Sequence, residues 1–287
     1  MKRSELSEAN PLAVSAIIPT YNRSHTISRA IKSVLSQTYK IHEIIVVDNG
    51  STDDTLELIK KDFPNIVCIE EKKLGVSAAR NTGISKVDKK SEWIAFLDSD
   101  DEWCPRKIES QVAAILEQNK YRLVHTDEIW YRRGQFVNQM KKHTKSGGDI
   151  FHDCLQRCLV SPSSVMIRRD LLNEVGLFDE DLAVCEDYDL WLRITARETI
   201  LHIDRPLTIK YGGHDDQLSR KFWGMDRFRI QSIEKLVASN ALTANQAYAA
   251  KEVAIAKIEI LINGAMKRGN AEFVNFYQKK LKEFQQL

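Results

Sequence analysis

The stretch WIAFLDSDDEW, residues 93–103, runs an apolar segment directly into a group of acidic side chains. Asp98, Asp100, Asp101 and Glu102 are four of the five residues that follow the apolar part. Like charges about 4 Å apart repel each other by roughly 4 kcal/mol at an effective dielectric constant near 20. A folded chain accepts such repulsion where something compensates the charge. The stretch therefore predicts a buried strand that ends at a polar site.

Similar apolar segments recur through the first hundred residues. They lie at residues 14–18, 43–47 and 66–69, and helix patterns at 27–35, 53–61 and 76–84 separate them. Repeated strand–helix units predict an α/β fold with a mostly parallel sheet flanked by helices. Ligands bind at the carboxyl ends of the strands in such sheets. The expected strand ends carry PTYN (residues 19–22), Asp48 and DSDD (residues 98–101), so we expect these polar groups to meet at one edge.

The pattern is less regular after residue 121. We expect loops over residues 130–160, and then a strand at 163–169, a helix at 186–194 and a strand at 207–211. From about residue 223 onward the sequence favours helices alone. TANQ at residues 243–246 has the spacing of a capping box, which starts a helix by satisfying its first backbone N–H groups.

Composition excludes several classes of protein. The 287 residues are 43% hydrophobic and 29% charged, with a net charge of +2, which is typical of a globular protein and gives no support for a nucleic-acid partner. The five cysteines contain no CxxC pair, so we expect reduced thiols rather than a zinc site. The first residues lack the apolar core of a signal peptide, and no apolar run approaches 18 residues. The expected localisation is cytoplasmic.

The acidic cluster at residues 98–102 has three uses to weigh. Two aspartates one residue apart can direct oxygens at one Mg²⁺ or Mn²⁺. A carboxylate nucleophile of the haloacid dehalogenase type is a second use, but those enzymes place the motif on the first strand, and here it closes the fourth. A solvated loop is the third. An EF-hand is excluded because the glycine and the twelfth-position glutamate are missing.

Five sequence segments that follow one another in a fixed order favour metal binding over the other two uses of the acidic cluster. They are VSAIIPTYN (14–22), IIVVDNGSTDDT (44–55), LGVSAARNTGI (74–84), WIAFLDSDDEW (93–103) and EDYDLWLR (186–193). Together they closely resemble family 2 glycosyltransferases, nucleotide-sugar enzymes of the GT-A fold. The resemblance covers residues 12–220, the expected GT-A domain. It leaves residues 221–287 as a C-terminal helical extension.

The resemblance implies a nucleotide site at the first two strand ends. Pro19, Thr20, Tyr21 and Asn22 would contact the nucleoside, with the tyrosine ring stacked on the base. Asp48 would accept a hydrogen bond from the base. The family often has a second acid after this position, where this chain has asparagine, and we expect little change from that difference.

The resemblance also implies where the diphosphate and a metal bind. Arg80 would hold the phosphate or the nucleotide. Asp98 would face the ribose and the metal, and Asp100 would bind Mn²⁺ or Mg²⁺ directly. His214, in a glycine-containing segment after the last expected strand, is a further candidate metal ligand.

Asp187 matches the position of the family's catalytic base. In an inverting transfer such a carboxylate takes the proton of the acceptor hydroxyl as that hydroxyl attacks the sugar. Glu186 would orient this helix end or the acceptor, and Trp191 is either an acceptor platform or a core residue. For an isolated acidic pair, the ordinary preference of acids for a helix start would be sufficient explanation.

The expected activity is therefore metal-dependent, inverting transfer of a sugar from a nucleoside diphosphate sugar, most simply a UDP-sugar. The acceptor would be a hydroxyl of a glycan or a lipid-linked molecule in cell-surface polysaccharide or lipopolysaccharide biosynthesis. Two alternatives are a sugar nucleotidyltransferase, which normally has a glycine-rich loop after its first strand, and a sugar-nucleotide binding module without activity. The QxxRW motif of processive synthases is missing, which favours addition of one sugar at a time.

The C-terminal segment is basic. Residues 225–287 contain ten Lys and Arg against six Asp and Glu, and end in the amphipathic stretch YQKKLKEF. Three uses stay open: packing on the domain, packing in a homodimer, and peripheral contact with anionic lipid at the inner face of a membrane.

Overall fold

The protein is described here from a computed structural model, in which residues 11–138, 140, 143–213 and 222–286 are placed. Their strands form one nine-stranded sheet in the order β3-β2-β1-β4-β8-β6-β9-β5, with β7 paired to β6. The strands are β1 (Val14–Thr20), β2 (Glu43–Asp48), β3 (Val67–Glu70), β4 (Trp93–Phe96), β5 (Glu102–Trp103), β6 (Leu123–Arg132), β7 (Gln135–Val137), β8 (Met166–Arg168) and β9 (Leu201–Gly212).

The first four strands are parallel to one another, as the strand–helix repeat predicts. The helices between them are α1 (Ile27–Leu35), α2 (Thr55–Asp62) and α3 (Val76–Lys86). Pairing turns antiparallel at β4–β8 and β8–β6 and parallel again at β6–β9, so the second half of the sheet is mixed. The predicted α/β class with helices on the sheet is confirmed.

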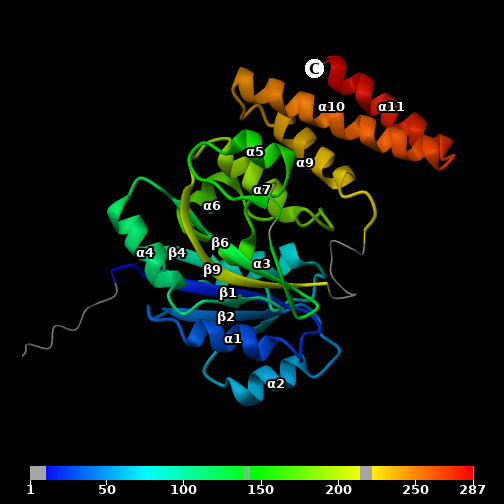
Figure 1. Cartoon of the computed structure of the whole chain (residues 1–287). Coiled ribbons are helices and arrows are strands. Elements are labelled where there is room, and N and C mark those ends of the chain that lie inside the picture. Colours follow the sequence, from blue (N-terminus) through cyan, green and yellow to red (C-terminus); the bar gives the residue numbers. More distant parts are fainter. Residues whose placement is uncertain (1–10, 139, 141–142, 214–221, 287) are drawn as a thin grey trace, which may run out of the picture.

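Both faces of the sheet are covered because β1 alternates between two cores. Every residue of β1 is buried, with Ala16 and Ile18 in one hydrophobic cluster and Ile17 in the other. The first cluster packs under α1 and α4 (Lys107–Glu117), and the second under α3 and the later helices. Figure 1 shows α1 and α2 on one side of β1 and β2, with the later helices on the opposite side.

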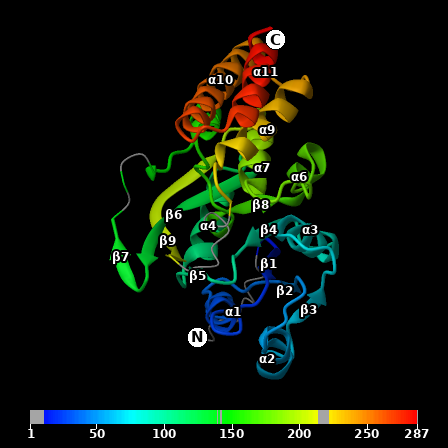
Figure 2. The same ribbon diagram turned by 90° about the vertical axis from the view of Figure 1, so that its right-hand side faces the viewer.

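The later helices include α5 (Phe151–Gln156), the 3₁₀ turn η2 (Pro162–Ser164), α6 (Arg169–Val175) and α7 (Glu186–Thr195). The C-terminal helices α9 (Asp226–Ala238), α10 (Ala244–Lys267) and α11 (Ala271–Gln286) follow. Side chains of all three, among them Ile233, Ile258 and Phe284, belong to the same cluster as Ile17. Figure 2 shows these helices stacked at the end of the molecule beyond α7, so the extension packs on the sheet domain.

The structure confirms the predicted start of a helix in the C-terminal segment. The capping box at Thr243 and Gln246 is present, because each side chain bonds the other residue's backbone N–H. Within the described residues, none of the helices has the length and apolar character needed to cross a bilayer.

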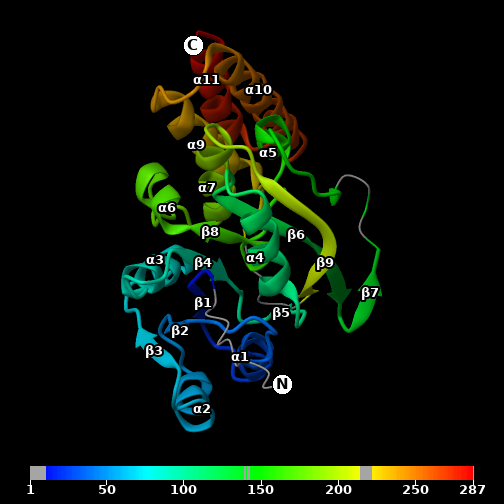
Figure 3. The same ribbon diagram turned by 90° about the vertical axis from the view of Figure 1, so that its left-hand side faces the viewer.

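One part of the sheet differs from the sequence-based prediction. Residues 130–160, expected to be loops, include the end of β6, all of β7 and α5. β9 is also longer than the expected strand at 207–211, since it starts at Leu201 and pairs with β6 along most of its length. Figure 3 shows β6 and β9 running together past α4 toward β7. These strands supply one wall of the cavity described below.

Candidate active site

The carboxyl ends of β1 and β2 hold two buried side-chain oxygen atoms that lack a hydrogen-bond partner among the described residues. Thr20 and Asp48 are opposite each other in the parallel register, and the Asn49 N–H donates to the Thr20 carbonyl at 2.8 Å. Asp48 Oδ2 accepts from the Ser51 N–H at 3.1 Å. Asp48 Oδ1 and Thr20 Oγ1 are both buried and have no hydrogen-bond partner among the described residues. Buried polar atoms of this kind are costly unless a ligand or water satisfies them.

The turns after these strands are tied together. Asn22 adopts the left-handed conformation, with φ of 50°, which asparagine tolerates better than most residues. Its side-chain oxygen accepts from the Thr52 N–H at 2.7 Å, and its own N–H donates to Ser51 Oγ at 2.9 Å. Tyr21 is 51% exposed beside this turn, whereas Pro19 is buried within β1. The structure thus brings the predicted nucleoside residues to one strand edge, with the tyrosine ring accessible.

Asn49 occupies the position where the family often has a second acid, and its side-chain amide has a structural role there. Its Nδ2 donates to the carbonyls of Glu71 and Lys73, at 3.0 and 2.8 Å, and its Oδ1 accepts from the Gly75 N–H at 2.7 Å. A carboxylate could not make the two donations. The amide therefore fixes the loop that leads into α3, the helix that carries Arg80.

Arg80 links three elements of the site. Only 3% of it is exposed, and α3 reaches the strand ends because Gly83 lets the helix approach β1, where an added Cβ would lie 2.5 Å from Ile17 Cγ2. Arg80 Nη1 donates to Glu186 Oε1 at 2.6 Å, and Nη2 donates to Asp98 Oδ1 at 2.7 Å. The guanidinium predicted to hold phosphate is thus engaged with two carboxylates of the chain itself.

A second cation, the half-buried Lys210 of β9, compensates the acidic cluster. Its Nζ lies 2.9 Å from Asp101 Oδ2 and 3.7 Å from Asp98 Oδ2. Burial favours the neutral amine, but these carboxylates outweigh it and raise the pKa of Lys210 well above its usual value. Burial likewise opposes ionisation of Asp98, yet the charges of Arg80 and Lys210 lower its pKa. The repulsion within the DSDD segment is therefore offset by two basic side chains.

Ser163 of η2 completes this arrangement. Its hydroxyl donates to Asp101 Oδ2 at 2.7 Å and accepts from the Asp98 N–H at 3.1 Å. Asp101 Oδ1 also accepts from the Tyr211 N–H at 3.2 Å. Asp101, with both oxygens engaged, is a structural member of the cluster.

Asp100 differs from its neighbours in the cluster. Burial and the charge of Asp98 raise its pKa, which indicates a carboxylate whose charge is poorly compensated. A bound cation would compensate that charge, so Asp100 fits the predicted metal ligand. The described residues contain no group of three or more His, Cys, Asp or Glu arranged around one metal position. His214, the other predicted ligand, lies outside the described residues.

The start of α7 carries the predicted base. Asp187 Oδ2 accepts from Cys158 Sγ at 3.2 Å, and its Oδ1 accepts from the Tyr188 N–H at 2.7 Å. Burial and the charge of Asp187 raise the pKa of Cys158 well above normal, so this thiol stays protonated and can donate. The same two factors raise the pKa of Glu186 to about 7. Glu186, bonded to Arg80, holds the helix start against α3, which fits its predicted orienting role.

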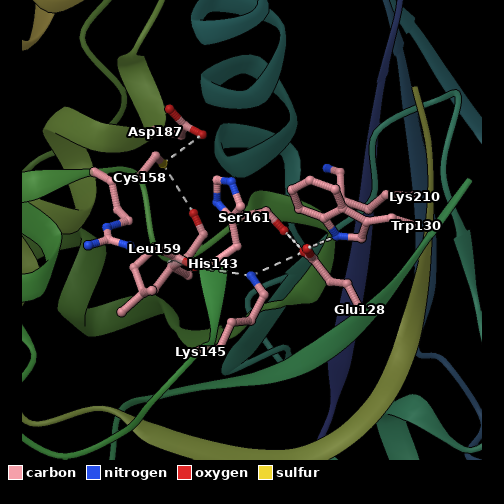
Figure 4. Close-up of a pocket in the computed structure, with 11 residues that line it drawn as sticks. Glu128, Trp130, His143, Lys145, Cys158, Leu159, Ser161, Asp187 and Lys210 are labelled. Atoms are coloured by element: carbon pink, nitrogen blue, oxygen red, sulfur yellow. Dashed lines mark hydrogen bonds and ion pairs between the residues drawn. The ribbon is translucent and has the colours of Figure 1, made fainter. Parts of the chain in front are cut away.

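A cavity of about 200 Å³ opens beside Asp187 (Figure 4). Figure 4 shows Asp187 and Cys158 at one end and Lys210 and Trp130 at the other. The cavity is lined by Glu128, Trp130, His143, Lys145, Arg157, Cys158, Leu159, Val160, Ser161, Asp187 and Lys210. It therefore extends from the predicted base toward the lysine that contacts Asp98.

Trp191, predicted to be either an acceptor platform or a core residue, does not line this cavity. It is 1% exposed and belongs to the main hydrophobic cluster. The burial of this side chain favours the core role over the platform role. The indole in the cavity belongs to Trp130.

Sequence reasoning missed Lys210, Ser163, Glu128 and Lys145. Lys210 is the one charged residue of the expected strand LTIKY, and a lone lysine inside an expected strand is a usable signal because a lysine held against the fold requires a partner. Glu128 and Trp130 are two apart in β6, so they share one face of the strand. Because the sequence predicts no strand for this segment, it does not place Glu128 and Trp130 on one face.

Comparison with known proteins gives a family match and several relatives. The family model described as "Glycosyl transferase family 2" matches residues 15–176. An uncharacterised glycosyltransferase of Rickettsia conorii is 38% identical over 207 residues, which is 69% of this chain and 33% of that protein. The chain spans between 28% and 44% of the length of three such rickettsial relatives.

A relative with a named activity and a solved structure extend the comparison. The Escherichia coli protein WfgD, named UDP-Glc:alpha-D-GlcNAc-diphosphoundecaprenol beta-1,3-glucosyltransferase, is 34% identical over 199 residues, covering 67% of this chain and 73% of WfgD. A crystal structure of S. aureus TarS 1–349 in complex with UDP-GlcNAc superposes with a TM-score of 0.66 at 19% identity, over 86% of this chain and 72% of that one. At that identity the likeness concerns the fold.

Proposed function

This chain belongs to glycosyl transferase family 2, and we propose that it transfers a sugar from a UDP-sugar, with inversion, to a hydroxyl of a glycan or lipid-linked acceptor. The observation that carries the proposal is the pairing of two features on one sheet edge. Buried acceptor atoms without partners lie at the ends of β1 and β2, and a carboxylate faces a cavity next to the acidic cluster. We assign this activity to residues 12–220, with 221–287 as the helical extension.

The nucleotide would bind over the ends of β1 and β2. Asp48 Oδ1 offers a buried acceptor to an N–H of the base, and Thr20 Oγ1 can donate or accept beside it. The exposed ring of Tyr21 supplies a flat apolar surface on which a base can stack. TarS, which shares this fold, has been crystallised with UDP and with UDP-GlcNAc, which supports a UDP-sugar donor here.

Replacing Asp48 by asparagine should raise the dissociation constant for UDP by about 10- to 100-fold, since a hydrogen bond to a charged group contributes roughly 1.5–3 kcal/mol. The amide can still accept from the Ser51 N–H, so the melting temperature should stay near that of the wild type. Isothermal titration calorimetry with UDP measures the effect. Asp54→Asn, an exposed aspartate nearby, is the matched control. Unchanged UDP affinity in Asp48→Asn would remove this assignment.

We also propose that the diphosphate binds with Mn²⁺ or Mg²⁺ at Asp100, with Asp98 beside it. When bound, the metal would offset the negative charge that develops on the departing diphosphate. The residues of the chain prepare this position: Arg80 and Lys210 fix the Asp98 carboxylate, and the Arg29 guanidinium donates to the Asp100 carbonyl at 2.6 Å. Phosphate oxygens would complete the metal's coordination, as is usual for such sites.

If Asp100 binds the metal, Asp100→Asn should lose the tightening of UDP binding that Mn²⁺ causes in the wild type. EDTA should remove that tightening from the wild type and leave the variant unchanged. Titration of UDP with and without Mn²⁺ measures both effects, and Asp62→Asn, exposed at the end of α2, serves as control. A full Mn²⁺ response in Asp100→Asn would contradict the ligand role.

The transfer step would use Asp187 as general base. Its carboxylate faces the cavity, where it can take the proton of an acceptor hydroxyl while that oxygen attacks the sugar. The Cys158 thiol and the Tyr188 N–H each engage one oxygen and orient the carboxylate. Glu186 and Arg80 hold the start of α7 against the acidic cluster, which sets the distance between base and donor.

The class of acceptor is proposed from the names of two relatives and from exposed apolar side chains in the C-terminal segment. Two E. coli relatives are named for transfer to GlcNAc-diphosphoundecaprenol, a lipid-linked sugar, which places them in assembly on a lipid carrier. A similar acceptor would bring this chain to the inner face of a membrane. The exposed Trp223, Met266 and Phe276 of the C-terminal segment could contact lipid there.

A further inference from the structure

We propose that the cavity beside Asp187 binds an acceptor sugar that carries a phosphate or diphosphate, and that Arg157 binds this anionic group. This inference rests on the proposed transferase function. It adds where the acceptor binds and which residue recognises its anionic group. The transfer step described above makes no use of Arg157, Trp130, Glu128 or Lys145, although all four line the cavity.

The position of the cavity fits an acceptor. One end is formed by Asp187 and Cys158, and the other by Lys210, whose ammonium group lies 3.7 Å from Asp98 (Figure 4). A molecule in this space would lie between the base and the donor end of the site. The volume of about 200 Å³ is below the roughly 300–1,000 Å³ of pockets for drug-sized ligands, so the cavity suits a single sugar unit.

The wall of the cavity is rigid. Glu128 accepts from Trp130 Nε1 at 2.9 Å and from the Ser161 hydroxyl, and it lies 3.3 Å from Lys145 Nζ. Lys145 also donates to the Leu159 carbonyl at 3.1 Å. These bonds hold the Trp130 indole in place beside the cavity. A fixed aromatic ring offers the apolar face of a sugar a flat surface at low entropic cost.

Among the described residues, no carboxylate pairs with Arg157, unlike the two lysines of the cavity lining. Lys145 is paired with Glu128, and Lys210 is paired with Asp101 and Asp98. Arg157 is half-buried at the end of α5 and has neither a hydrogen bond nor an ion pair with any residue in the described part of the chain. A guanidinium presents a planar fork of donors that matches phosphate. Its place at the boundary between cavity and solvent suits a phosphate attached to a sugar inside.

Two probes, one with and one without the anionic diphosphate group, test this inference. One is α-D-GlcNAc diphosphate esterified with a short alkyl chain, and the other is the neutral alkyl glycoside of the same sugar. Dissociation constants are measured by calorimetry with UDP at saturation. The wild type should bind the diphosphate probe more tightly. Arg157→Ala should weaken that probe by about 10- to 100-fold and the neutral probe by less than about 3-fold, since one charged contact is lost.

Two further variants complete the design. Arg157→Lys, which keeps the charge but loses the fork, should give an intermediate loss and guards against a folding defect in the alanine variant. Arg197→Ala removes an exposed arginine elsewhere and should change neither constant. UDP affinity without probe should be equal in all four proteins. If the wild type does not prefer the diphosphate probe, or binds neither probe, the inference is wrong.

The outcomes separate this inference from the function on which it rests. A weaker affinity for UDP in Arg157→Ala would mean that the arginine binds the donor diphosphate and would overturn the inference. Equal losses for both probes would show that Arg157 only shapes the cavity, which also overturns it. Failure of the wild type to bind UDP at all would instead contradict the proposed function.

Discussion

Replacing Asp187 by asparagine should lower the rate of sugar transfer by about 10²- to 10⁴-fold, the usual contribution of a general base. The amide has nearly the same shape and can still accept from the Tyr188 N–H, so the start of α7 should stay in place. It cannot take a proton from the acceptor hydroxyl. The affinity for UDP should therefore remain within about 2-fold of the wild type, because Asp187 lies in the cavity and not at the ends of β1 and β2.

The measurement is single-turnover transfer from a UDP-sugar to the acceptor, together with UDP titration on the same samples. Asp181→Asn makes the same chemical change at an exposed position shortly before α7 and should leave the rate unchanged. A fully active Asp187→Asn would exclude this residue as the base. A parallel loss of UDP affinity would mean that the substitution disturbs the donor site instead.

Replacing Arg80 by methionine should lower the free energy of unfolding by about 3–5 kcal/mol, the usual cost of removing one partner from a buried ion pair. The variant keeps much of the buried volume but leaves the Asp98 and Glu186 carboxylates without the guanidinium that bonds both. Because Asp98 and the start of α7 are both held by Arg80, transfer should also fall. Chemical denaturation measures the stability effect.

Arg106→Met is the matched control for that experiment. Arg106 is exposed and pairs with Glu109 at 2.7 Å, and surface pairs of this kind contribute about 0–1 kcal/mol. Its substitution should change stability by less than about 1 kcal/mol. If Arg80→Met lowered the free energy of unfolding by equally little, the ion pairs that link α3 to Asp98 and to α7 would not stabilise the site as proposed.

The strand ends could be predicted from sequence because short-range patterns specify them. Thr20, Asp48 and Asp98 each follow an apolar segment, and parallel pairing of those segments brings their ends to one edge. Asp187 could be placed at a helix start for a similar reason. These positions depend on local periodicity and on the direction of the strands, both of which the chain displays residue by residue.

The partners of these residues could not be predicted in the same way. Arg80 was expected to hold phosphate, and its contacts with Asp98 and Glu186 span 18 and 106 positions in the chain. The acidic cluster suggested a bound metal cation. In the structure, Arg80 and Lys210 compensate much of the negative charge of this cluster. Which base compensates which acid is decided by tertiary packing, and a sequence pattern does not specify it.

β6 was missed for a physical reason that also explains its role. Its pairing with β9 shifts register around Asp127, and the residues from Glu128 to Arg132 mix charged and aromatic side chains with a single isoleucine. A strand that lines a polar cavity lacks the apolar run by which buried strands are found. Trp130 falls at the start of residues 130–160, which were expected to be loops, and Glu128 falls just before them in a segment with no predicted element. Both nevertheless form part of the wall beside Asp187.

The most direct test of the account is a crystal structure with UDP and Mn²⁺. We expect the uracil ring within hydrogen-bonding distance of Asp48, near Thr20 and Tyr21, and the manganese ion in contact with Asp100 and the diphosphate. The cavity beside Asp187 should remain open for an acceptor. UDP bound away from the ends of β1 and β2, or manganese bound without contact to Asp100, would contradict it.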